Sequence, residues 1–498
     1  MQNHSYENGI EEIRLNDDDI VIVHPNSFQL NKHYYPDVIK SCLSKKVEEF
    51  LKLKNEDIVE RYCQLYNLTA AEELLKLLQS SPKYFRWSGG DLFHVRDRWD
   101  DESNEKMILI EMNSCPSGQK SMPSRHQNGY HEMMRRMFKP LILSVEISGA
   151  LAVLYDKNVM ETRAYAEALA DVMNEKVFYV KFDNRCKPSN KIKFVDKELF
   201  VKDSSGQWHL IRAAFRYVTQ KPWNRIPIDT RTLIINPIIA CLAGGRNKLL
   251  ASHAYHLFNE KYAKHDIEIR MPETIINVQK QDIPKCIKEL GGMGVIKIPY
   301  LNAGQGIYTI VNEQELNRFM NIVSPSSYQS YIVQSLVGHS EWNTKATNRY
   351  SHICTVMNEK KEGFVKDLRM QICSSDKGFR PTSIYCRRAR EVLSPDRDKI
   401  FDSWQMLGTN LTVKRNTSDL NLDPSEWTTE SERLIIMDEN EDSGLNIDNF
   451  VDAYVQTVLG TLAIDQLAQQ LTDENGKFNM NLFRSLDSDD ELVHEFLL

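Results

Sequence analysis

The sequence predicts a mixed protein of the α/β (α+β) class, and three kinds of segment indicate it. Residues 150–181 read as a strand, an amphipathic helix and a second strand, the order of a βαβ unit with a parallel sheet. Residues 85–95 and 107–113 read as two strands with a polar connection, which favours an antiparallel pair. Later segments indicate further antiparallel strands, namely YIVQSLVG, KDLRMQICSS and SIYCRRAREVL.

Length and composition limit the classes of protein. A chain of 498 residues, 41% of them hydrophobic, is long enough for several domains. Its 62 Lys and Arg against 69 Asp and Glu give a net charge of -7, so we expect no nucleic-acid partner. A signal peptide and an apolar run of about 18 residues are both lacking, so no membrane partner is expected. Nine scattered cysteines without a CxxC pair indicate reduced thiols and a cytoplasmic protein.

The first half of the chain divides into two regions. In residues 1–148, apolar positions recur at helical spacing between residues 36 and 80, so two helices are expected before the antiparallel strand pair. In residues 149–240, the strand, helix and strand are followed by TLIINP, a further buried strand. We expect this second region to be a small doubly wound α/β domain.

The second half also divides into two regions. Residues 241–335 combine a helix that opens near Lys248, a second helix, and strands on either side of a glycine-bearing loop. Residues 336–498 hold the remaining antiparallel strands and a long helix near 448–471. Residues 396–498 carry no pattern that predicts a chemical role.

The segment ILIEMN predicts a metal site. Side chains alternate along a strand, so Glu111 and Asn113 project from one face, about 7 Å apart. A carboxylate and an amide oxygen are hard ligands of the kind that magnesium prefers. Pairing of the two strands brings Asp91 towards Glu111. The alternative is that these residues merely cap an edge strand.

The segment GVIKIPYLNAGQGIYTI predicts a phosphate site. It places Lys297 on a strand and Gly304, Gln305 and Gly306 in the following turn. A lysine holds phosphate oxygens as a point charge, and a glycine-containing turn lets backbone N–H groups approach them. The P-loop pattern GxxxxGK[ST] is absent. The alternative is a plain β-hairpin.

Two further residues fit a nucleotide site. Gln334 ends an apolar strand whose backbone is suited to an adenine edge beside an apolar wall. Lys248 opens a helix at a position from which its ammonium reaches phosphate. The alternatives are an ordinary core strand and a surface lysine.

The order of these motifs resembles that of the ATP-grasp superfamily. NPIIACLAGGRNKLL, GVIKIPYLNAGQGIYTI and YIVQSLV follow one another as its lysine-initiated helix, strand lysine with glycine-rich lid, and adenine strand do. Here IEMN precedes the lid, as in the circularly permuted branch that includes eukaryotic-type glutathione synthetases and glutathionylspermidine synthetases. The resemblance covers roughly residues 85–395. It implies a circularly permuted ATP-grasp architecture with the small α/β substrate domain inserted.

The resemblance also implies an activity. ATP-grasp ligases join a carboxylate to an amine through an acyl phosphate and release ADP and phosphate, with ATP and magnesium as cofactors. The implied substrates are a small carboxylate and an amine of the amino-acid, peptide or polyamine class, and related ligases are often homodimers. Two alternatives remain open: a small-molecule kinase with the same fold, and a nucleotide-binding regulator without turnover.

By the same resemblance, each motif residue takes a role. Magnesium is assigned to Asp91, Glu111 and Asn113, and the α and β phosphates to Lys248 and Lys297. The rest of the nucleotide site is assigned to Gly304, Gln305, Gly306 and Gln334.

Arginines are expected to hold the developing negative charge. KDLRMQI places Arg369 on a strand. The next segment, YCRRAREVL, contains several arginines, of which we select Arg388 as catalytic. Arg216, after an apolar strand, is expected to contact the carboxylate substrate. A charged sheet edge is the alternative. Relatives often carry an arginine two residues before the strand aspartate, where this chain has Gly89, so the substitutes considered are Arg96, Arg98 and Arg125.

Overall fold

A computed structural model gives the fold of most of the chain. It describes residues 20–98, 105–123, 129–182, 190–301, 304–322, 330–342, 349–354, 356–357, 362–414, 427–440, 443–487 and 489–496. Within these residues, none of the helices has the length and apolar character needed to cross a membrane.

The central sheet is antiparallel and supplies most of the candidate site. Its strands run in the order β14, β2, β16, β17 and β20, with β3 on β2 and β15 on β16. The two N-terminal strands of this sheet are the pair that the sequence predicted, and Asp91 lies directly opposite Glu111. The strands are β2 (Trp87–Asp97), β3 (Glu105–Ser114), β14 (Tyr350–His352), β15 (Val356–Met357), β16 (Gly363–Ser375), β17 (Gly378–Val392) and β20 (Leu434–Ile435).

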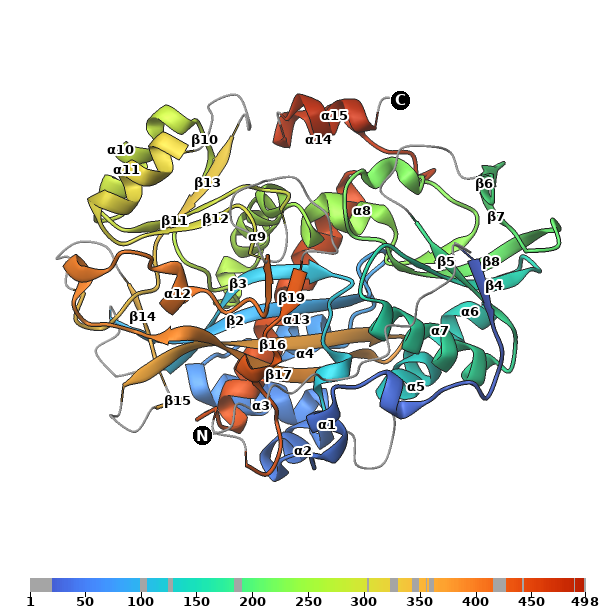
Figure 1. Cartoon of the computed structure of the whole chain (residues 1–498), viewed down its shortest axis with the longest axis horizontal. Coiled ribbons are helices and arrows are strands. Elements are labelled where there is room, and N and C mark those ends of the chain that lie inside the picture. The colour runs from blue at the N-terminus through green and yellow to red at the C-terminus, as the bar shows by residue number, and fades with distance from the viewer. Residues whose placement is uncertain are drawn as a thin grey trace, which may run out of the picture.

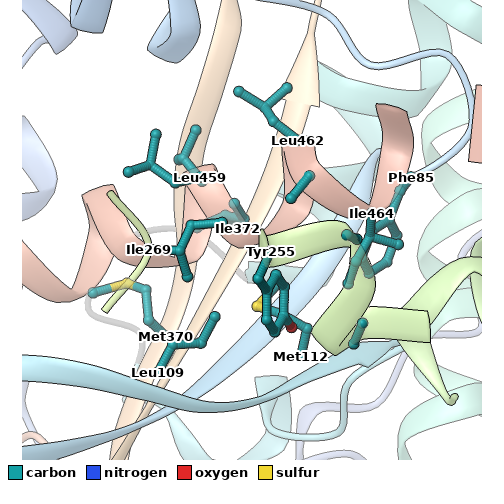
Figure 2. Close-up of a cluster of buried hydrophobic side chains, with 14 of the residues drawn as sticks. Phe85, Leu109, Met112, Tyr255, Ile269, Met370, Ile372, Leu459, Leu462 and Ile464 are labelled. Carbon is teal, nitrogen blue, oxygen red and sulfur yellow. The ribbon is translucent and has the colours of Figure 1, made fainter. Parts of the chain in front are cut away.

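The long C-terminal helix α13 (Ile447–Gln470) covers one face of the central sheet, and its position near 448–471 was predicted. Almost all of its residues are buried, which suits a helix that is apolar on most sides. Gly90 allows the close approach, because a Cβ there would lie 2.6 Å from Oγ1 of Thr457. Figure 2 shows part of the resulting core, in which Leu459, Leu462 and Ile464 of the helix belong to one cluster with Leu109, Met112 and other apolar side chains.

The segment between residues 36 and 80 forms four helices rather than the predicted two. Backbone conformation separates them, because Leu53 is extended after the second helix and Asn67 adopts a left-handed φ of 49° after the third. Apolar spacing alone does not mark such breaks. The helices are α1 (Pro36–Lys40), α2 (Lys45–Lys52), α3 (Asn55–Tyr66) and α4 (Ala71–Leu78).

The predicted βαβ unit is present and lies to the right of the central sheet in Figure 1. β4 (Ala150–Tyr155) and β5 (Val177–Lys181) are parallel and joined by α7 (Val159–Met173). β8 (Trp208–Tyr217) and β9 (Leu233–Ile235) extend the parallel part. The other strands of this α/β sheet pair antiparallel; they are β1 (Ile20–Val23), β6 (Ile192–Val195) and β7 (Glu198–Lys202). Two helices that come before β4 in the sequence also pack on the sheet, α5 (Gly129–Met133) and α6 (Lys139–Leu143). β1 belongs to this sheet although it lies within residues 1–148.

A smaller antiparallel sheet, here called the lid sheet, has the order β10, β13, β11, β12. Two helices pack on one face through Ile296, Phe319, Val333 and other apolar residues, and the opposite face carries Lys297 and Gln334. The elements are β10 (Thr274–Val278), α10 (Ile283–Glu289), β11 (Gly294–Lys297), β12 (Ile307–Ile310), α11 (Glu313–Ile322) and β13 (Tyr331–Gln334).

The remaining elements connect these units. α8 (Ile238–Ala240) and α9 (Lys248–Tyr262) lie between the α/β sheet and the lid sheet in sequence. The other elements are α12 (Trp404–Leu407), β18 (Thr412–Lys414), β19 (Trp427–Thr429), α14 (Met480–Leu486) and α15 (Asp490–Glu495).

Candidate active site

A cleft lies between the lid sheet and the central sheet. Its empty volume, counting space open to solvent, is about 740 Å³. One part of the wall is apolar and holds Phe93, Ile110, Val295, Leu336, Trp404 and Leu407. The other part is charged and holds Asp91, Glu111, Lys297, Asp367 and Arg387. A cavity with an apolar part and a few convergent charges is suited to a ligand with a flat ring and an anionic tail.

The predicted metal residues share one face of the central sheet. Directly paired residues of neighbouring strands project from the same face, and the pairings run Glu111 to Asp91 to Arg369. Asn113 pairs with Gly89 one step along the same face. The register between β2 and β3 shifts between Asp91 and Leu92, at a β-bulge of the kind that changes the direction of side chains.

Asp91 is bound by two arginines. Arg369 donates from Nε and Nη2 to its two carboxylate oxygens at 2.5 Å each, and Nη2 of Arg387 lies 3.2 Å from Oδ2. Burial by itself raises the pKa of Asp91, but the two guanidinium groups outweigh it and hold the pKa at about 2. Arg387 also pairs with Asp367 through two hydrogen bonds. The carboxylate is therefore charged and already engaged.

The two predicted phosphate lysines converge on Glu111. Nζ of Lys248, at the first position of α9, lies 3.3 Å from Oε1 of Glu111 and donates to the carbonyl oxygen of Leu301 at 2.6 Å. Nζ of Lys297 donates to Oε1 of Gln334 at 2.7 Å. Burial, aided by the Lys248 ammonium and opposed by Glu111, lowers the pKa of Lys297 to about 8. Three predicted nucleotide residues and one predicted metal residue thus meet in one place.

The glycine turn stands beside the cleft. Gly304 and Gly306 have φ values of +78° and +63°, which residues with a Cβ rarely adopt, and Gln305 lies between them. A Cβ on Gly304 would lie 2.7 Å from Nδ2 of Asn410, so the turn packs closely on the segment after α12. This packing leaves the turn next to the apolar part of the wall.

Arg388 and Arg216 do not line the cleft. Arg388 lies over the ring of Phe364, 4.9 Å from its centre, on the opposite face of β17 from Arg387. Arg216 is fully buried and donates to Oγ of Ser114 at 2.9 Å and to the carbonyl oxygens of Asn236 and Val218. One of these hydrogen bonds joins β8 to the last residue of β3. Their roles as catalytic and substrate residues stay predictions that this arrangement does not favour.

Arg246 was missed by the sequence analysis. Its Nη1 donates to Oδ1 of Asn113 at 3.3 Å, and its Nε donates to the carbonyl oxygen of Ser114 at 3.0 Å. It precedes Lys248 by two residues, directly after Gly245 in the segment LAGGRNK. A basic residue so close to the predicted phosphate lysine was the available signal.

Gly89 makes room for the turn after β3, because a Cβ there would lie 2.7 Å from Cβ of Pro116. An arginine is therefore excluded at this position without a shift of the turn. Arg96 is exposed, and Nη2 of Arg98 donates to the carbonyl oxygens of His339 and Ser340, so neither replaces it. The third candidate, at position 125, lies outside the described residues.

The donors present fit one magnesium ion better than a larger metal cluster. Glu111 and Asn113 offer hard oxygens on one face, each with one basic partner, Lys248 or Arg246, whereas Asp91 is held by two arginines. Among the described residues, no group of three or more His, Cys, Asp or Glu side chains is arranged to hold a metal. The glycine turn between β11 and β12 also contains no acidic residue.

Comparisons with known proteins identify structural likenesses only. No family model and no curated protein sequence matches the chain. A glutathione synthetase-like effector from Globodera pallida, in its apo form, is similar with 10% identity and a TM-score of 0.39, over 75% of this chain and 88% of that one. A RimK domain ATP-grasp protein from Sphaerobacter thermophilus is similar with 12% identity and a TM-score of 0.27, over 47% and 90%.

The predicted mixed α/β class is confirmed: a small lid sheet faces a larger antiparallel sheet, and a third sheet carries the parallel βαβ unit. At TM-scores below 0.5, the two likenesses carry no argument, so the ATP-grasp architecture stays a prediction. The circular permutation stays a prediction.

Proposed function

We propose that the protein is an ATP-dependent ligase that joins a carboxylate to an amine. The observation that carries the proposal is the meeting of Lys248, Lys297 and Glu111 where two cavities adjoin. Both cavities are lined by Glu111, Lys297 and Gln334; Lys248 lines the first, and the second is the cleft with the apolar wall. The apolar part accepts the adenine ring, and the two ammonium groups hold phosphate oxygens as point charges. Glu111 and Asn113 would hold magnesium, which would supply neutralisation of the charge on the transferred phosphoryl group.

The chemistry has two steps. A carboxylate oxygen of the first substrate attacks the γ-phosphorus of ATP, so that an acyl phosphate forms and ADP leaves. The amine then attacks the acyl carbon, an amide bond forms, and inorganic phosphate leaves with the electrons of the broken C–O bond. Arg387, which lines the cleft, and Arg369, which shares Asp91 with it, would stabilise the negative charge that develops on the phosphoryl oxygens.

Product analysis tests this proposal. Purified protein is incubated with ATP, magnesium and a panel of amino acids, peptides and polyamines, and ADP, phosphate and the product mass are measured. A ligase releases ADP and phosphate only when an acid and an amine are both present. A kinase releases ADP without phosphate, and binding of ATP without turnover across the panel indicates a regulator; either result contradicts the proposal.

Substitution of Glu111 by glutamine is expected to lower magnesium-dependent turnover at least about 100-fold, because an amide oxygen is a weak replacement for an anionic metal ligand. Asn113→Ala is expected to act in the same direction. Steady-state phosphate release over a magnesium titration measures both effects. Wild-type rates in both variants, with folding confirmed by circular dichroism, would remove these residues from the metal site.

ATP binding is expected to weaken as the pH rises through 8. The Lys297 ammonium loses its proton near this pH in the free protein, whereas bound phosphate favours the charged form. The dissociation constant therefore rises above pH 8, by up to about tenfold per pH unit. Titration calorimetry from pH 7 to 9 at fixed magnesium measures it. Lys297→Arg, which stays charged, is the matched variant, and an equal slope in both proteins would contradict the prediction.

A further inference from the structure

The C-terminal segment contains a buried carboxylate next to the candidate nucleotide site. Asp487 follows α14 and is 1% exposed. Its Oδ2 accepts a hydrogen bond from Nδ2 of Asn247 at 2.8 Å, and its Oδ1 accepts one from the hydroxyl of Tyr300 at 2.7 Å. In Figure 1 the C-terminal helices lie at the edge of the molecule, beyond α8 and α9. No pattern in the sequence predicted this contact.

Both partners of Asp487 are adjacent to the phosphate lysines. Asn247 is the N-cap of α9, and its Oδ1 accepts from the backbone N–H groups of Leu249 and Leu250 at 3.1 and 3.3 Å. An N-cap oxygen fixes the first turn of a helix, and Lys248 occupies the first position of that turn. The amide of Asn247 is bonded at both ends, so its orientation is set by Asp487.

The second partner, Tyr300, lies in the segment after β11, the strand that carries Lys297. Tyr300 lies three residues after Lys297, and the N–H of Lys248 donates to the carbonyl oxygen of Pro299 at 3.0 Å. The start of α9 and the segment after β11 are therefore joined by their backbones, by Nζ of Lys248 on Leu301, and by the carboxylate that bridges them.

The other end of the segment is attached to the α/β domain. Glu495 accepts from the backbone N–H groups of Trp223 and Asn224, and Nδ2 of Asn224 donates to its carbonyl oxygen at 2.6 Å. The ring of Trp223 meets that of Tyr300 edge to face, with centres 6.4 Å apart. The C-terminal helices thus contact the α/β domain and both lysine-bearing elements.

Stability alone does not account for a carboxylate at this position. The two side-chain partners of Asp487 are neutral, and burial raises its pKa, so among the described residues its charge is desolvated without an ion pair. The carboxylate instead provides two strong acceptors with fixed directions. Such geometry suits a residue whose function is to hold two elements in register.

We propose that Asp487 is a positioning residue that fixes Lys248 and Lys297 relative to each other for nucleotide phosphate binding. The inference rests on the proposed function for its ligand, ATP. Asp487 itself contacts no lysine; it acts through Asn247 and Tyr300.

Two measurements on the full-length chain test the proposal. For Asp487→Ala, the dissociation constant of ATP with magnesium is expected to rise about tenfold, the effect of one lost charge-assisted hydrogen bond. Hydrogen exchange, followed without nucleotide, is expected to accelerate at residues 247–251 and 299–301. Asp487→Asn keeps one acceptor oxygen and is expected to recover part of the affinity.

Glu495→Gln is the matched control, because it weakens the other attachment of the same segment. It is expected to lower the melting temperature while ATP binding stays within about twofold. Wild-type ATP affinity in Asp487→Ala overturns the inference and leaves the proposed function intact. Absence of ATP binding by the wild type overturns both. If Asp487→Ala does not fold, Tyr300→Phe decides, with about threefold weaker binding expected and unchanged binding contrary to the proposal.

Discussion

Replacement of Arg387 by alanine is expected to lower ATP-dependent phosphate release about 1,000-fold, whereas Arg388→Ala keeps it within about twofold. Arg387 lines the cleft, and its guanidinium bridges Asp91 and Asp367 at the charged part of the wall. A cation at that position compensates charge on the phosphoryl group in transit. Arg388 instead lies over Phe364, outside the cleft.

The comparison needs a folding control, because Arg387 is 6% exposed and pairs with two buried carboxylates. Arg387→Lys keeps the charge but not the two-pronged geometry, and we expect it to fold and to recover only part of the rate. The rates are measured at saturating ATP with near-UV circular dichroism as the check. An inactive Arg388→Ala beside an active Arg387→Ala would reverse the assignment.

The choice between these neighbouring arginines shows what the sequence lacked. YCRRAREVL indicates a strand with several arginines, and alternation places Arg387 and Arg388 on opposite faces. Only the pairing of β17 with β16, which sets Arg387 opposite Asp367, tells which face meets the cleft. A shift of one residue exchanges the faces, so the correct member of the pair depends on register.

Local patterns predicted the parts of the site that depend on neighbouring residues. Glu111 and Asn113 share a face because a strand has a period of two, and Asp91 meets them because consecutive antiparallel strands pair. The βαβ unit and α13 were predictable for the same reason. Lys297 and Gln334 were assigned to one site only through a resemblance to a known family. They are 37 residues apart in the sequence, and the structure joins them by a hydrogen bond.

Contacts between distant segments were not predictable. Asp487 lies 240 residues from Asn247, and no periodicity links an isolated aspartate to a helix N-cap so far away. Arg246 was overlooked because its partners are oxygens at the end of β3, more than 130 residues earlier in the chain. Long-range polar contacts of this kind are set by tertiary packing, and a single sequence carries little trace of them.

Removal of the Asp91 carboxylate is expected to give the largest loss of stability. Asp91→Ala leaves Arg369 buried without its two-pronged partner, and breaking a buried ion pair costs about 3–5 kcal/mol of the free energy of unfolding. Urea unfolding followed by circular dichroism measures the change. Turnover is expected to be lost as well, because Arg369 and Arg387 lose the group that orients them.

Asp97→Ala is the matched control for this variant. Asp97 lies at the far end of the same strand, is buried, and pairs with Arg349 and Lys106 outside the residues that line the cleft. It is expected to destabilise the protein while turnover per folded molecule is retained. Equal losses of turnover in the two variants would mean that Asp91 acts on activity through general stability alone.

The pH dependence of stability separates the Asp91 charge from the loss of side-chain volume. The pKa of Asp91 is about 2 in the folded protein, below the value of about 3.9 for an unfolded chain. Its stabilising effect is therefore fully present above pH 4 and is lost as the pH falls from about 4 to about 2. The difference in unfolding free energy between the wild type and Asp91→Ala should shrink over this interval. A difference that stays constant down to pH 2 would assign the loss to packing instead of to the ion pairs.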